Sequence, residues 1–106
     1  MEKAAEYKTL NEFYPFYLRE HSHPTNKILH FIGTGLVLAI VVSSIIIRKP
    51  LLLWLCPVFG YGFAWVGHFF IEKNRPATFK YPLLSLLSDF RLFFDILRGK
   101  VKIKER

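Results

Sequence analysis

The chain has 106 residues, of which 52% are hydrophobic and 17% aromatic, and its mean hydropathy is positive. A soluble domain of this length normally carries fewer apolar residues, so the composition favours a membrane protein. The single cysteine excludes an intrachain disulfide framework and a cysteine-rich zinc site. The net charge of +7 does not indicate nucleic-acid binding, because the lysines and arginines flank apolar segments, where anionic lipid attracts them.

The first predicted segment, residues 5–22, is rich in aromatic side chains, with Phe13, Tyr14, Phe16 and Tyr17 close together. Aromatic residues of this kind are enriched at the boundary between membrane and water. We therefore expect an interfacial segment that precedes the membrane-spanning part of the chain.

Two apolar runs follow, Ile28 to Ile47 and Leu51 to Ile71, and neither contains a charged residue. Each has 20 or 21 residues, enough for a helix to cross a hydrocarbon layer about 30 Å thick. A polar turn at residues 48–50 separates them. The sequence thus predicts an all-α membrane protein built on a transmembrane helical hairpin, with spans over residues 24–48 and 51–72. The basic residues on both flanks predict that both termini are cytoplasmic.

A last helical pattern covers residues 82–98, and Gly99 follows as a C-terminal stop. Four polar residues share one face of this helix: Ser88, Arg91, Asp95 and Arg98. We expect this amphipathic helix either to lie in the plane of the membrane interface or to pack against the hairpin. No repeat or separate domain is evident, so residues 1–106 are expected to form one domain.

Each span carries one histidine at the end distant from the turn. His30 lies 19 residues before Lys49, and His68 lies 19 residues after it, so each is about 28 Å from the turn at about 1.5 Å per residue. An ionisable side chain inside a span is costly and indicates a functional site. We therefore predict that His30 and His68 meet at one depth, near the cytoplasmic edge. Cys56 is 12 residues from His68, too deep to join them.

Further metal-ligating side chains flank these two histidines. His23 and Asn26 share a helical stripe with His30, and Glu72 lies four residues after His68. The sequence predicts a metal site of His30, His68 and Glu72, with His23 or His21 as an additional ligand, although residue 21 is off the stripe. Such donors suit ferrous iron, manganese or zinc, and two histidines with one carboxylate are typical of non-haem iron oxygenases. Structural roles are the alternative, with Glu72 paired to a neighbouring basic residue.

Three stretches of the chain form a joint motif: Phe13-x2-Phe16-Tyr17, His21-x-His23-x2-Asn26-x3-His30 and Gly67-His68-x3-Glu72-x2-Arg75-Pro76-Ala77. This motif resembles that of the Mpo-like membrane proteins, whose fungal representative is an iron-dependent 2-hydroxy fatty acid dioxygenase. The continuation through Thr78-Phe79, Pro82-Leu83 and Asp89-Phe90 is similar to the short bacterial branch of that family. The resemblance covers most of residues 13–90.

The resemblance implies ferrous iron, Fe2+, held by histidines, and oxidation of a 2-hydroxy fatty acid by molecular oxygen to an acid one carbon shorter. The matching positions here are His23, His30 and His68, with Glu72 and Asn26 beside them. The implied partners are the lipid bilayer and a fatty acyl substrate, and the implied location is a bacterial inner membrane. Because the fungal enzyme has further membrane segments, a homo-oligomer that completes the acyl-binding cavity is left open.

The expected mechanism assigns catalysis to His30, His68 and Glu72, with His23 completing or gating the metal coordination. The competing hypothesis is a non-catalytic membrane scaffold or lipid-binding protein, whose histidines are structural or bind zinc. The identity of the bound metal separates these two hypotheses, because zinc has no redox chemistry.

For the substrate, the expected binding residues are Arg75, Arg19 and Asn26. An arginine can bind a carboxylate through two parallel hydrogen bonds, so Arg75 or Arg19 is expected to hold the acid group. The acyl tail is expected to run toward the glycines between the two spans.

Overall fold

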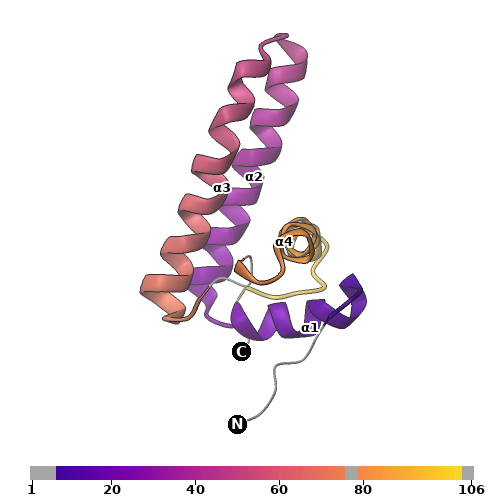
Figure 1. Cartoon of the computed structure of the whole chain (residues 1–106), viewed down its shortest axis with the longest axis vertical. Coiled ribbons are helices and arrows are strands. Elements are labelled where there is room, and N and C mark those ends of the chain that lie inside the picture. Colours follow the sequence, from indigo (N-terminus) through magenta and orange to yellow (C-terminus); the bar gives the residue numbers. More distant parts are fainter. Residues whose placement is uncertain (1–6, 76–78, 104–106) are drawn as a thin grey trace.

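The computed structural model describes residues 7–75 and 79–103, and no strand occurs within those two ranges. The α-helices are α1 (Leu10–Glu20), α2 (Pro24–Ile46), α3 (Leu55–Val66) and α4 (Pro82–Leu97). A 3₁₀ helix, η1 (Pro50–Trp54), leads into α3, and a π-helix, η2 (Gly67–Glu72), continues it. The predicted all-α hairpin is confirmed (Figure 1). Residues 5 and 6 of the predicted interfacial segment, residues 76 and 77 of the joint motif and Thr78 of its continuation lie outside the described residues.

Both arms of the hairpin are long and apolar enough to cross a membrane, over Pro24–Ile46 and Pro50–Glu72. Only 22% of the apolar stretch in the first arm and 6% of that in the second are buried within the structure, so these arms do not form the core of a soluble protein. Near the turn, Ile46 and Leu51 are 72% and 77% exposed. Apolar surface of this extent is typical of helices that face lipid.

Local sequence signals set the two ends of the first arm. Pro24 occupies the first position of α2, where the missing N–H has no helical partner in any case. The Nδ1 atom of His23 caps this helix by accepting a hydrogen bond of 3.1 Å from the Thr25 N–H. At the other end, Arg48 adopts a left-handed φ of 57°, and the chain reverses into Pro50 at the start of η1.

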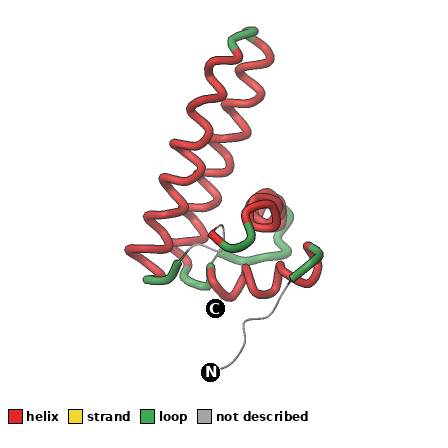
Figure 2. Tube along the Cα trace, viewed as in Figure 1, coloured by secondary structure: helices red, strands yellow, loops and turns green. Residues whose placement is uncertain are grey.

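Two shorter helices, α1 and α4, lie across the hairpin at the end opposite its turn (Figures 1 and 2). The view that shows α2 and α3 lengthwise shows α4 nearly end-on. Of the two alternatives given for this helix, packing against the hairpin is the one observed, because α4 contacts both α1 and α2. Its transverse direction also agrees with a helix that lies in the plane of a membrane interface.

The serines and the aspartate Asp95 on the polar face of α4 are turned inward, against the other helices, whereas its Arg98 is exposed. Ser85, Ser88 and Asp95 are buried, whereas Leu83 and Leu97 are 66% and 60% exposed. A helix at the surface of a soluble protein has the opposite polarity. The outward leucines of α4 therefore extend the apolar surface of the hairpin.

Two tyrosines of α1 supply the polar partners that α4 requires. The Tyr14 hydroxyl donates a hydrogen bond of 2.9 Å to Asp95 Oδ2, and the Tyr17 hydroxyl donates one of 2.5 Å to Asp89 Oδ1. The same two tyrosines pack with Phe13 and Leu92 in the hydrophobic core cluster. This junction between α1 and α4 fixes the segment that follows α1, where the first residue of the candidate site lies.

Candidate metal centre and adjoining cavity

Three buried histidines meet where the hairpin joins the transverse helices: His21 directly after α1, His30 in α2 and His68 in η2. Their exposed fractions are 1%, 5% and 2%. The ring centroids are 4.1 Å apart for His21 and His30, 4.4 Å for His21 and His68, and 5.1 Å for His30 and His68. The predicted meeting of His30 and His68 is therefore confirmed, and His21 is the third member of the group.

Each of the three imidazoles has an oxygen acceptor beside its Nδ1 atom. His21 Nδ1 is 2.7 Å from the Tyr17 carbonyl oxygen, and His30 Nδ1 is 3.1 Å from the Asn26 carbonyl oxygen. A carbonyl oxygen can only accept, so Nδ1 carries the proton in both rings. This tautomer leaves the Nε2 lone pair of each ring free to bind a metal.

The third histidine, His68, follows the same rule through a side-chain amide. Its Nδ1 atom is 2.7 Å from Asn74 Oδ1. The amide group of Asn74 donates hydrogen bonds of 3.2 Å to the backbone carbonyl and the carboxylate of Glu20, which places the amide oxygen toward His68. Asn74 thus holds His68 in the Nδ1-protonated tautomer, and Glu20 orients Asn74.

The spacing of the Nε2 atoms fits a metal ion. Those of His21 and His30 are 2.9 Å apart, and with both Nδ1 atoms protonated no proton lies between them. Two facing lone pairs at this distance repel each other unless a cation binds both. Two imidazole nitrogens bound at right angles to one metal, with bonds of about 2.1 Å, lie about 3.0 Å apart. A nitrogen from each of the three histidines lies within 4.8 Å of the other two, so the set can share one ion.

Burial keeps His21 in the neutral form that a metal requires. Desolvation lowers the pKa of His21 well below its ordinary value, and the neighbouring His30 and His68 lower this pKa further. The Tyr17 ring also stacks on His21, with ring centroids 3.9 Å apart. His21 is therefore held both by the backbone and by the ring of the same tyrosine.

A change of helix type presents His68 to the other two histidines. In the π-helix η2 the backbone bonds span five residues instead of four, a feature frequent at functional sites. Lys73 then ends η2 in a left-handed conformation, with φ of 60°, and the Asn74 N–H donates to the His68 carbonyl at 2.9 Å. At the start of η2, the Asn26 side-chain oxygen occupies the place that a Cβ on Gly67 would take, so α2 and η2 approach closely beside the site.

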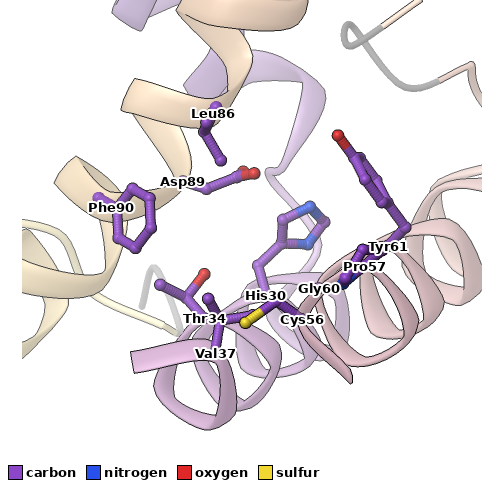
Figure 3. A pocket seen from close by; sticks show the side chains of 10 residues that line it. All are labelled: His30, Thr34, Val37, Cys56, Pro57, Gly60, Tyr61, Leu86, Asp89 and Phe90. Atoms are coloured by element: carbon purple, nitrogen blue, oxygen red, sulfur yellow. The ribbon is translucent and has the colours of Figure 1, made fainter. Parts of the chain in front are cut away.

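A cavity of about 190 Å³ lies beside His30, between α2, α3 and α4. Figure 3 shows the His30 imidazole, the Thr34 hydroxyl and the Asp89 carboxylate around one side of this space. Mostly apolar side chains, among them Val37 and Pro57, line the remainder, together with Cys56 and Tyr61. The cavity is therefore amphipathic, with its polar part next to the histidine group.

The sequence model of a protein family described as 2-hydroxy-palmitic acid dioxygenase Mpo1-like matches residues 7–101. The chain belongs to this family. No curated protein and no solved structure matches the chain. In this Mpo1-like protein the match includes all four helices and the three clustered histidines.

Two of the predicted ligands, His23 and Glu72, contact each other outside the histidine group. The Glu72 carboxylate accepts a hydrogen bond of 2.9 Å from the backbone N–H of His23, which is exposed. The predicted stripe treated residue 23 as helical, but α2 begins at Pro24 and His23 is extended. Likewise, η2 is a π-helix, so residues 68 and 72 no longer share a face as they would in an α-helix.

The predicted substrate-binding residues also lie apart from the cavity lining. Arg19 and Arg75 are exposed, and their guanidinium groups lie over the rings of Phe16 and Phe79 at 6.0 Å and 5.4 Å. Asn26 is fully buried, and its side-chain amide has no hydrogen-bond partner within residues 7–75 and 79–103. Asn26 reaches the site through its backbone carbonyl, which orients His30.

Tyr17, Asn74 and Asp89 belong to the site but were outside the predicted set, and His21 was predicted only as an alternative to His23. Tyr17 and His21 are four residues apart, a spacing that signals a shared helical face at the end of α1. Asn74 lies between Glu72 and Arg75 of the joint motif, and Asp89 lies in the continuation that is similar to the bacterial branch, but neither was assigned a role. Their contacts with His68 and Tyr17 depend on a left-handed turn and on helix packing, which a sequence pattern does not encode.

Proposed function

We propose that this protein is a membrane-embedded, non-haem iron dioxygenase that oxidises 2-hydroxy fatty acids to acids one carbon shorter. The observation that carries the proposal is the group of three buried histidines, each with a free Nε2 atom, beside an amphipathic cavity. Membership of the Mpo1-like family supplies the substrate class. Both termini are proposed to be cytoplasmic, on the side of the basic flanks.

The side chains of His21, His30 and His68 would hold the iron. Three neutral nitrogen ligands leave other coordination positions open, as metal-dependent catalysis requires. Ferrous iron bound there supplies the redox chemistry with molecular oxygen that no side chain of the chain can provide. The balanced reaction is oxidation of one 2-hydroxy acid by one O2 to the shortened acid, carbon dioxide and water.

The remaining residues position these ligands and exclude water. Tyr17 holds His21 by its carbonyl and its ring, while Asn74 holds His68 in the required tautomer. Such outer contacts fix ligand orientation and tune affinity in metal sites. The three histidines are each at most 5% exposed, so the reacting group of a substrate would leave water when it enters.

Activity of the iron-loaded and zinc-loaded proteins tests this function. Detergent-purified protein, loaded anaerobically with ferrous iron, should consume oxygen with 2-hydroxypalmitic acid and release the acid one carbon shorter. The same protein loaded with zinc should release none, because zinc is not redox-active. Equal turnover with the two metals, or no shortened acid with iron, would contradict the proposal.

The competing function is a non-catalytic membrane protein whose histidine group binds zinc. Three histidines also suit zinc, so the donor set alone does not separate these functions. A chain purified with a full equivalent of zinc, and inactive after exchange to iron, would favour the structural role. The predicted ligands His23 and Glu72 are tested in the same preparation, since His23→Ala and Glu72→Gln should retain the metal if the three-histidine set is right.

A further inference from the structure

The polar part of the cavity contains one carboxylate, that of Asp89. One of its oxygens, Oδ1, accepts the hydrogen bond from the Tyr17 hydroxyl. An ionised carboxylate has about four lone-pair sites for hydrogen bonds, so most of its accepting capacity remains unused. Within the described part of the chain, no basic residue forms an ion pair with Asp89.

A partly buried carboxylate without a counter-charge is costly unless hydrogen-bond donors satisfy it. Figure 3 shows the Asp89 carboxylate directed toward the space that His30 also faces. A ligand in that space with a hydroxyl group would supply the missing donor. The acid group of a fatty acid would not, because at neutral pH it is ionised and carries no hydrogen-bond donor.

We infer that Asp89 accepts a hydrogen bond from the 2-hydroxyl group of the substrate and thereby selects 2-hydroxy fatty acids over unsubstituted ones. This inference rests on the proposed function. It places the hydroxyl-bearing carbon between Asp89 and His30, and the acyl tail along the apolar part of the cavity toward Val37 and Pro57. The tail then lies parallel to the hairpin, in the direction of its turn.

The expected selectivity arises because an acid without the 2-hydroxyl offers no hydrogen-bond donor to Asp89. When an acid without the 2-hydroxyl fills the cavity, it displaces water from Asp89 and leaves the second carboxylate oxygen of Asp89 without a donor. Sites built to bind a hydroxyl group discriminate strongly against analogues that lack it, and one hydrogen bond to a charged group corresponds to about ten- to a hundredfold in affinity. The protein should therefore bind 2-hydroxypalmitic acid at least about tenfold more tightly than palmitic acid.

Binding to zinc-loaded protein in detergent tests this selectivity without turnover. Asp89→Asn should reduce the preference for 2-hydroxypalmitic acid over palmitic acid to near unity, with one equivalent of zinc still bound. Asp95→Asn is the matched control, because Asp95 also lies on α4 and accepts from a tyrosine of α1, but does not line the cavity. This control should keep the preference. An unchanged preference in Asp89→Asn, or an equal loss in both variants, would overturn the inference.

A measurement on the wild-type protein covers the case in which Asp89→Asn does not fold. The 2-oxo analogue of palmitic acid has an acceptor in place of the donor, so it should bind more weakly than the 2-hydroxy acid. Equal or tighter binding of the 2-oxo acid would contradict the role of Asp89. A different result would contradict the proposed function alone: the wild-type protein prefers the 2-hydroxy acid in binding, but its iron-loaded form releases no shortened acid.

Discussion

Substitution of Gly67 by alanine tests how tightly the two arms of the hairpin must approach beside the histidines. A Cβ at this position would overlap the side-chain oxygen of Asn26, which is fully buried. Gly67 directly precedes His68, and Asn26 orients His30. The added methyl group should therefore separate α2 from η2 and move two ligands apart.

The magnitude of this effect follows from two opposing contributions. Forcing extra volume into a packed site costs about 1–3 kcal/mol, whereas alanine in a helix is favoured over glycine by about 0.5–1 kcal/mol. Because the overlap with the buried Asn26 side chain is severe, the upper end of the packing cost, about 3 kcal/mol, applies. Gly67→Ala should thus destabilise the metal-loaded protein by about 2–2.5 kcal/mol, a fall in Tm of about 8–20 °C for a domain of this size. The metal affinity should fall as well, because the Nε2 atoms no longer converge.

Gly62 provides the matched control for this substitution. A Cβ there meets no atom within 4 Å, and Gly62 lies in α3, so Gly62→Ala should raise the Tm slightly. Adding Asn26→Ala to Gly67→Ala should restore part of the lost stability, since the overlapping amide is removed. Thermal unfolding in detergent and metal analysis measure both effects. Equal stability and full metal content in Gly67→Ala would refute the close approach of the two arms.

Three further predictions concern the contacts around the site. Asn74→Ala removes the acceptor that fixes His68 and should lower metal affinity by about 10–100-fold in a competition titration; unchanged affinity would remove Asn74 from the site. Tyr14→Phe deprives Asp95 of a buried donor and should lower the free energy of unfolding by about 1–3 kcal/mol, which chemical denaturation in detergent measures. In metal-free protein, burial raises the pKa of Asp89 from its ordinary 3.8 to about 7. The folded chain therefore binds a proton at the Asp89 carboxylate more tightly than the unfolded chain does. Its stabilising contribution is full below pH 3.8 and should be lost as the pH rises through about 7, a loss that Asp89→Asn should abolish in Tm measurements.

The hairpin could be predicted because each arm is encoded locally, as an uninterrupted apolar run with a polar break. The meeting of His30 and His68 followed from the same pattern, since both were counted from one turn and antiparallel arms keep equal distances. The second arm contains the short 3₁₀ and π segments η1 and η2, but most of both arms is α-helical, so equal residue counts still give similar distances from the turn. The long-range contact between His30 and His68 could therefore be predicted from a local sequence pattern.

The sequence offered His21 and His23 as alternative additional ligands and could not decide between them in the same way. His21 precedes the start of α2, so helical periodicity does not apply to it, and its position depends on the packing of α1 against α4. Glu72 was assigned a ligand role on the spacing of an α-helix, whereas the chain forms a π-helix there. The role of Asp89 could not be predicted without knowing which way its side chain on α4 points. It points inward, where Tyr17 of α1 donates a hydrogen bond to it.

The metal content of two neighbouring variants, His21→Ala and His23→Ala, tests the three-histidine centre most directly. Both remove one imidazole from the same short connection between α1 and α2, but only His21 lies with His30 and His68. After anaerobic loading with ferrous iron and removal of unbound metal, His21→Ala should retain well under one equivalent of iron per chain, and His23→Ala should retain a full equivalent. A full equivalent in His21→Ala together with loss of iron in His23→Ala would contradict the centre described above.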